Sequence, residues 1–194
     1  MALQRGFSWT AALAGAAAML LLLLLAGAAI AFGGLYPVAA SKPDPAGIGP
    51  ILHETMERGI KRSARGLVGP RLSAADVLEG GSHFKGMCQQ CHGGPGAERD
   101  EFAAGMNPRP PDLAKTQGEW TREEIFWIAK HGIKMSGMPA FGNGAPDDEL
   151  WKVAAFVKQL PKVSASRYAS LPNAHAQEGT GEEAGHSHSH SHSH

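Results

Sequence analysis

The stretch Cys88-Gln89-Gln90-Cys91-His92 carries the residues whose types and spacing point to chemistry. A Cys-x-x-Cys-His stretch is the attachment pattern of a c-type haem. Its two thiols bond to the two vinyl groups of the porphyrin, and the histidine can then bind the iron through Nε2. The pattern predicts one covalently bound haem c, with Cys88 and Cys91 as attachment residues and His92 as an axial ligand of the iron.

Three other interpretations of the two cysteines are a structural disulfide, a thioredoxin-like redox pair and half of a zinc site. A structural zinc site needs four ligands, and the chain has only these two cysteines. A redox pair would follow a strand in a βαβ pattern, which the sequence lacks. The formal net charge of zero gives no reason to expect a nucleic-acid partner.

The residues around this motif resemble those of class I cytochromes c. Gly80 and Phe84 precede Cys88 by eight and four residues. The resemblance implies an all-α fold over residues 71–165, with three or more helices around one haem. It also implies that Gly80 and Phe84 meet Val153 and Phe156 where the first and last helices cross.

The distal iron ligand has three candidates. Met138 lies in a Gly-Met-Pro sequence after a capping box at Thr121 and before the terminal helix at 147–160. The same resemblance implies that Met138 is the second axial ligand, and a thioether raises the reduction potential relative to a second imidazole. Met135 and His131 are the alternatives. Sequence alone leaves open whether Pro95, Pro110 or Pro111 orients His92.

An apolar segment precedes this domain. Residues 11–32 contain no charge and are long enough to cross a bilayer. Arg5 before it and the lack of basic residues before Lys42 place the N-terminus in the cytoplasm and the remaining chain outside. The alternative is a cleaved signal peptide, because Val38-Ala39-Ala40 resembles a cleavage site. We expect residues 1–36 to form a cytoplasmic tip and an uncleaved transmembrane anchor.

A more particular resemblance covers residues 10–172. The stretches 36–40 and 124–141, taken with the apolar segment, are similar to bacterial membrane-anchored monohaem cytochromes c. This implies a single-pass protein of the bacterial inner membrane with its haem domain in the periplasm. The implied function is non-enzymatic transfer of single electrons between redox proteins.

Residues 37–70 are expected to be a juxtamembrane linker with a basic helix over 51–65. Four basic residues lie in its last turns: Arg58, Lys61, Arg62 and Arg65. The helix then rests on anionic headgroups, docks on a partner, or is only a solvated spacer. His53 is a further possible ligand, although an isolated surface histidine usually has no such role.

Residues 166–194 are predicted to form a disordered, His-rich tail. Alternating histidine and serine could hold a divalent transition metal through several neutral imidazoles, unless the tail is a purification tag or merely polar. The five histidines concerned are His186, His188, His190, His192 and His194.

Two further functions compete with that of a free electron carrier. The chain could be the haem subunit of a membrane dehydrogenase or oxidase complex, or a haem-based sensor or peroxidase. The last function requires that Met138 is absent from the iron or easily displaced. Lys85, Lys130 and Lys134 could surround an exposed haem edge and bind partners, or could be ordinary solvated lysines.

Overall fold

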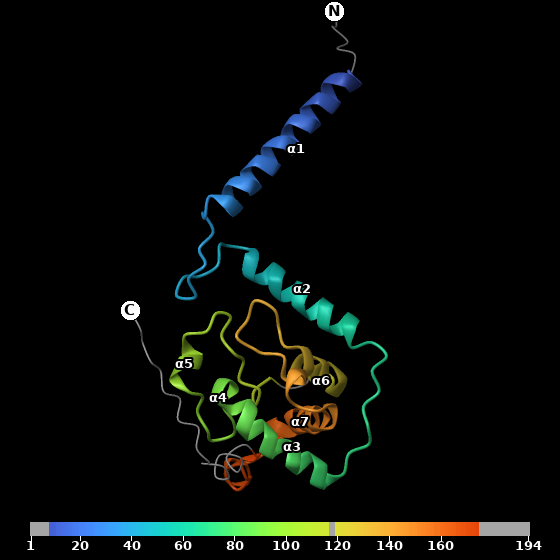
Figure 1. The fold of residues 1–194 in the computed structure, drawn as a ribbon, viewed down its shortest axis with the longest axis vertical. Coiled ribbons are helices and arrows are strands. Elements are labelled where there is room, and N and C mark those ends of the chain that lie inside the picture. The colour runs from blue at the N-terminus through green and yellow to red at the C-terminus, as the bar shows by residue number, and fades with distance from the viewer. Residues whose placement is uncertain (1–7, 117–118, 175–194) are drawn as a thin grey trace, which may run out of the picture. The chain divides into compact units, whose positions relative to one another are not determined.

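A computed structural model describes residues 8–116 and 119–174 of the chain. Within this part, every regular element is a helix, and the only β pairing is an isolated bridge between Gly94 and Ala97. The predicted all-α class is therefore confirmed. The chain divides into two compact units, one ending at Asp44 and one beginning at Pro45, which we describe separately (Figure 1).

The first unit is dominated by helix α1, Trp9–Phe32. It has 24 residues and no charged side chain. Ser8 begins the helix, because its hydroxyl accepts a hydrogen bond from the Ala11 N–H. At 1.5 Å per residue the helix is about 36 Å long, more than the roughly 30 Å of a bilayer core. By length and composition α1 is compatible with the expected single-pass anchor.

The second unit begins with α2, Ile48–Ser63, which packs against α6, Arg122–His131. Ile60 near the end of α2, and Ala64 just beyond it, are buried. Helix α2 begins at Ile48, three residues before the expected start at residue 51. Its start follows Gly47, whose φ of +87° is a left-handed conformation that glycine adopts without strain.

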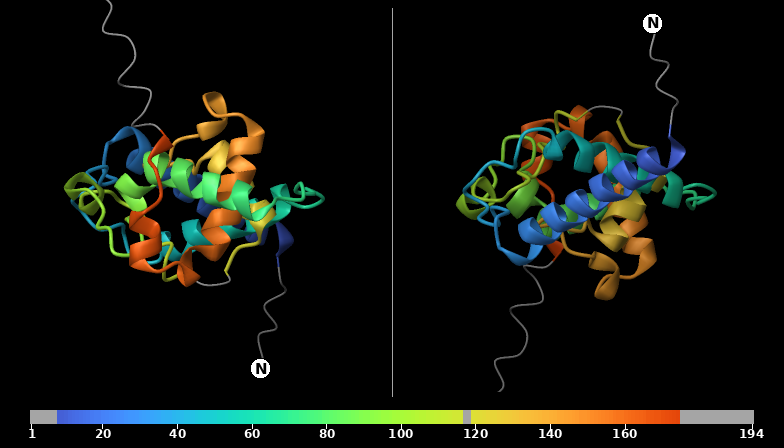
Figure 2. Two further views of the ribbon diagram at one scale, coloured as in Figure 1. Left: turned by 90° about the horizontal axis from the view of Figure 1, so that it is seen from below. Right: turned by 90° about the horizontal axis from the view of Figure 1, so that it is seen from above.

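The core of the second unit is the crossing of α3, Ala74–Met87, with α7, Asp147–Gln159 (Figures 1 and 2). A Cβ atom on Gly80 would overlap the backbone carbonyl of Lys152, so the two backbones touch there. The rings of Phe84 and Phe156 lie 5.7 Å apart between centroids. Both observations agree with the implied crossing.

Reciprocal capping boxes fix where α3 and α6 begin. The Ser73 hydroxyl accepts from the Asp76 N–H while the Asp76 carboxylate accepts from the Ser73 N–H, and Thr121 and Glu124 do the same. The capping box at Thr121 was predicted from the sequence. The short helices are α4, Gln89–His92; α5, Glu101–Ala104; η1, Phe141–Asn143; and η2, Leu160–Lys162.

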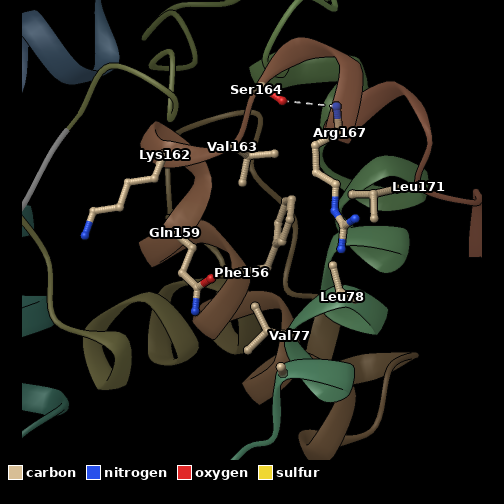
Figure 3. A pocket seen from close by; sticks show the side chains of 10 residues that line it. Val77, Leu78, Phe156, Gln159, Lys162, Val163, Ser164, Arg167 and Leu171 are labelled. Atoms are coloured by element: carbon tan, nitrogen blue, oxygen red, sulfur yellow. Dashed lines mark hydrogen bonds between the residues drawn. The ribbon is translucent and has the colours of Figure 1, made fainter.

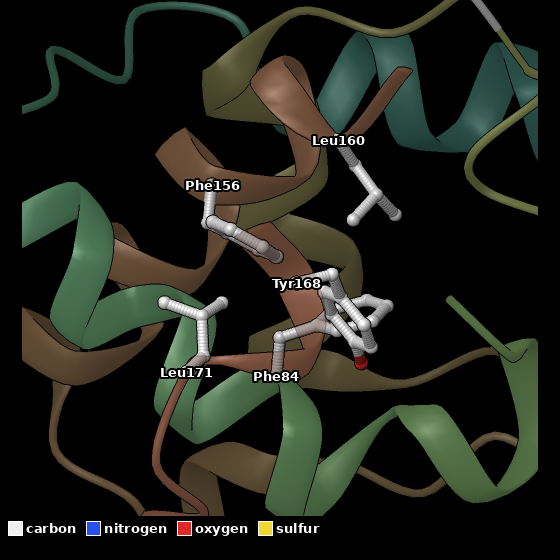
Figure 4. Packing of buried hydrophobic residues seen from close by; sticks show 5 residues of the cluster. All are labelled: Phe84, Phe156, Leu160, Tyr168 and Leu171. Atoms are coloured by element: carbon white, nitrogen blue, oxygen red, sulfur yellow. The ribbon is translucent and has the colours of Figure 1, made fainter. Parts of the chain in front are cut away.

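The predicted boundary of the tail at residue 166 is wrong. Helix α8, Ala165–Ala169, spans this boundary, and Tyr168 is only 1% exposed. Tyr168 and Leu171 complete the hydrophobic cluster around Phe84 and Phe156 (Figure 4). The segment is too short to show apolar periodicity, but its two large apolar side chains are buried. The five tail histidines and their proposed metal lie outside the described residues, so that part of the expectation remains a prediction.

Candidate haem-attachment site

The Cys-x-x-Cys-His residues form one tight turn at the end of α3. Cys88 ends α3, and its carbonyl accepts hydrogen bonds from the N–H groups of Cys91 (3.2 Å) and His92 (2.9 Å). Both cysteines are free and half-buried. The turn therefore holds both thiols and the imidazole within one short helical segment.

The environment of Cys88 argues against a redox pair. Burial, with a smaller contribution from Cys91, raises the pKa of the Cys88 thiol to about 12. Thiols that exchange disulfides have lowered pKa values, because the thiolate is the nucleophile. In the described residues, no three His, Cys, Asp or Glu side chains are grouped to hold a metal ion, which also argues against a zinc site.

The imidazole of His92 is held by a backbone carbonyl. Its Nδ1 lies 2.9 Å from the carbonyl oxygen of Pro111. A carbonyl oxygen can only accept, so Nδ1 must carry the proton, and the lone pair is left on Nε2. Burial lowers the pKa of His92, although its bond to Pro111 opposes that effect. A neutral imidazole with a free Nε2 is the form that binds iron.

Arg99 is a residue of this site that the sequence reasoning missed. Its Nη1 donates a hydrogen bond of 2.6 Å to the carbonyl of Pro110, next to the residue that orients His92. Its positive charge also contributes to the lowered pKa of His92. An isolated arginine in a Gly-rich stretch gives no sequence signal for such a contact. Of the three prolines left open, it is Pro111 whose carbonyl accepts the hydrogen bond from His92.

The loop between α6 and α7, which we call the distal loop, places Met138 in a more buried position than Met135 or His131. Met138 is half-buried, and its N–H donates to the Ser136 hydroxyl at 3.2 Å. Met135 is 75% exposed, and His131 is exposed with its ring 4.9 Å from that of Trp127. This arrangement favours Met138, but its place as an iron ligand remains a prediction.

A second methionine packs against this loop and was not anticipated. An ideal Cβ on Gly137 would come within 3.0 Å of both Sδ and Cε of Met106, so the thioether of Met106 lies directly against the residue before Met138. Met106 belongs to the Pro-rich stretch 105–113. It links that stretch to the distal loop.

The C-terminal segment is tied to the attachment turn. The Tyr168 hydroxyl donates a hydrogen bond of 2.8 Å to the side chain of Gln89, between the two cysteines. A Cβ on Gly94 would collide with the Tyr168 ring, so the ring lies directly on the chain after His92. Neither contact had a sequence signal, because both join residues more than seventy positions apart.

One groove of the second unit lies away from this turn. It has a volume of about 410 Å³ and is formed by residues of α3, α7 and the segment 162–171 (Figure 3). Val77, Leu78 and Phe156 contribute apolar surface, and Arg167 lies beside them. Since none of the predicted ligands lines this groove, we give it no part in haem binding.

The residues of the turn fit a covalently attached haem. Two free thiols one turn apart match the two bonds to the porphyrin, and His92 presents an unprotonated Nε2. The half-buried thioether of Met138 is a soft, neutral donor suited to the same iron. Cys88, Cys91, His92 and Met138 would hold the group.

Comparisons with known proteins agree with this geometry. Residues 75–157 match the family model described as cytochrome c oxidase, cbb3-type, subunit III. The chain is 28% identical over 88 residues to cytochrome c6 of Thermosynechococcus vestitus, and equally to cytochrome c6 of Thermostichus vulcanus. These alignments cover 45% of this chain and 73% of each relative. No solved structure is significantly similar to the chain.

Proposed function

We propose that residues 75–157, which match a cytochrome c family model, form a monohaem domain of the class I cytochrome c type, and that the chain is a membrane-tethered electron carrier on the periplasmic face of a bacterial inner membrane. The family implies haem-based electron transfer with a covalently bound haem c. When bound, haem takes up and releases one electron. The tether, the side of the membrane and the partners are the parts that we propose.

The observation that best supports this proposal is the hydrogen bond from the His92 imidazole to the Pro111 carbonyl. It fixes the imidazole as a neutral ligand within the same turn that supplies both thiols. The half-buried Met138 would be the second donor to the iron, and the pair would leave no position for a substrate. Such a site supports transfer of electrons rather than catalysis on a bound molecule.

Carbon monoxide is the direct test of the axial set. The purified full chain, once reduced, should show a low-spin spectrum and should not bind carbon monoxide. Met138→Leu should bind it readily and should have a lower reduction potential, since a thioether ligand raises the potential. The matched control is Met135→Leu, whose exposed side chain should leave both properties unchanged. Ready binding of carbon monoxide by the unaltered chain would overturn the carrier function.

The tether and its orientation need separate measurements. The intact mass of the membrane-extracted protein should include α1, whereas cleavage after Ala40 would leave a chain beginning at Ser41. Extraction with alkaline carbonate should leave the protein in the membrane pellet. Protease added to spheroplasts should cleave the haem domain if that domain lies outside the membrane.

A second candidate is the haem subunit of a larger oxidase or dehydrogenase complex. It is favoured by the matched family description, which names a subunit of a cytochrome c oxidase. The chemistry of this chain would be unchanged, but its partner would be permanent. Purification in mild detergent separates the two candidates, because a subunit should elute with its complex and a carrier should elute alone.

A further inference from the structure

Helix α2 presents one side to the core and a chemically distinct side to the surroundings. Ile60 is buried on the side that packs on α6. The other side carries Ile51, Thr55, Arg58 and Arg62, at the i, i+4, i+7, i+11 spacing of a single helix face. All four are exposed, and Ile51 is 67% exposed. This outer face therefore combines apolar and cationic side chains.

The cations of this segment differ in their partners. Arg58 pairs with Glu54 at 2.5 Å, and Lys61 pairs with Glu57 at 2.9 Å. No ion pair is found for Arg62 or the exposed Arg65 within the described residues. Residues 54–65 hold four basic and two acidic side chains, so this part of the chain keeps a net charge of +2 after the two ion pairs.

The connection to α1 is short. Fifteen residues separate Phe32 from Ile48, and a fully extended chain of that length spans about 50 Å. If α1 is the anchor of the proposed function, on which this inference rests, the linker keeps the first residue of α2 within about 50 Å of the end of α1. Because the anchor links α2 covalently to the membrane, α2 meets lipid headgroups at a high effective concentration, even if each contact is weak.

We infer that the outer face of α2 binds the anionic phospholipid headgroups of the membrane in which α1 is anchored. Arg58, Arg62 and Arg65 bind lipid phosphates, and Ile51 enters the boundary between headgroups and acyl chains. Leu52, which is 43% exposed, adds apolar surface at the edge of this face. An acidic protein could use the same charges, but the tether supplies the lipid surface continuously. Docking would confine the haem domain to a limited set of orientations on the membrane.

The test uses the haem-loaded full chain in nanodiscs made of phosphatidylcholine alone or mixed with phosphatidylglycerol. A nitroxide is attached through Ile51→Cys on the outer face, and a control nitroxide through Ser166→Cys on α8. Electron paramagnetic resonance then measures relaxation of each label by nickel chelated to lipid headgroups. We expect strong relaxation only for the label at position 51, and only in the discs that contain phosphatidylglycerol.

Charge removal distinguishes docking from simple proximity. The triple change Arg58→Gln, Arg62→Gln, Arg65→Gln should lower the ratio of docked to undocked protein by about a hundredfold, from the contribution of each basic residue near an anionic surface. The matched control is Arg71→Gln, Arg109→Gln, Arg167→Gln, which removes the same charge from exposed positions elsewhere and should preserve docking.

Two results would overturn the inference. One is a label at position 51 that relaxes equally in both kinds of disc, or in both triple variants. The other is a protein that alkaline carbonate strips from the membrane, because α1 is then not an anchor and the tether fails with it. Carbonate-resistant protein with an undocked α2 would refute the inference alone and leave the proposed electron carrier intact.

Discussion

Replacement of Gly80 by alanine should destabilise the haem domain more than the same change at other helical glycines. A Cβ at position 80 would overlap the Lys152 carbonyl and lie 2.8 Å from the Val153 nitrogen. Both obstacles are backbone atoms of α7, so no rotation of a side chain can relieve the overlap. The α3–α7 crossing must therefore open.

The expected loss of stability in Gly80→Ala is the sum of two opposing effects. Overpacking in a dense core costs about 1–3 kcal/mol, and a contact with immovable backbone belongs at or above the upper end. Alanine returns up to about 1 kcal/mol, since glycine is a poor helix former. We expect Gly80→Ala to lower the free energy of unfolding by about 2 kcal/mol. For a domain near 100 residues this lowers the midpoint of thermal unfolding by about 10 °C.

Two other glycines supply matched controls. A Cβ on Gly81 would meet the side chains of Phe156 and Leu171 at 2.7 and 2.8 Å, which can move, so Gly81→Ala should cost about 1 kcal/mol. A Cβ on Gly59 of α2 meets nothing within 4 Å, so Gly59→Ala should stabilise by about 0.5–1 kcal/mol.

The assay is thermal unfolding of the haem-loaded full chain in detergent, followed by haem absorbance and far-UV circular dichroism. The expected order of midpoints is Gly59→Ala, unaltered chain, Gly81→Ala, Gly80→Ala, from highest to lowest. If Gly80→Ala unfolded at or above the midpoint of Gly81→Ala, the backbone contact between α3 and α7 would not be the limiting one.

Three further changes test individual contacts. Tyr168→Phe removes the hydrogen bond to Gln89 and should cost about 1 kcal/mol in denaturant unfolding, whereas Tyr36→Phe in the exposed linker should cost much less. Arg99→Gln should lower the potentiometric reduction potential by about 35–70 mV, the scale of one cation about 10 Å away at an effective dielectric constant of 20–40, and a rise would contradict it. Hydrogen bonds from Ser73 hold the pKa of Asp76 below its ordinary 3.8, so its stabilisation is present at neutral pH and lost as pH falls through the folded pKa. The stability gap between the unaltered chain and Asp76→Ala should therefore close in acid, as urea unfolding at several pH values would show.

Local patterns were enough to predict much of the fold. The capping box at Thr121 was predicted because a helix start depends on residues only three apart. The close approach at Gly80 was implied by family resemblance, and the structure shows it. These features need only neighbouring residues or a known motif.

Contacts between distant segments could not be predicted in the same way. Tyr168 and Gln89 lie 79 positions apart, and no periodicity links them. The same limit applies to the choice of Pro111 over Pro95 and Pro110, because a backbone carbonyl of any of the three would serve equally until the loop is placed. Arg99 was missed for the same reason, since its contact depends on where that loop lies.

The structure also changes the role expected for the three lysines near the haem edge. Lys85, one of three lysines expected near the haem edge, donates to the carbonyls of Ala169 and Leu171 at 3.1 and 2.8 Å, so its charge holds the C-terminal segment. Lys130 pairs with Asp147 at 2.7 Å. Of the three, only Lys134 has no ion pair or hydrogen bond within the described residues. A single free cation gives weak, easily screened attraction to an acidic partner. Electron transfer should therefore slow only slightly as salt rises, and a steep dependence would require a docking surface that does not involve these lysines.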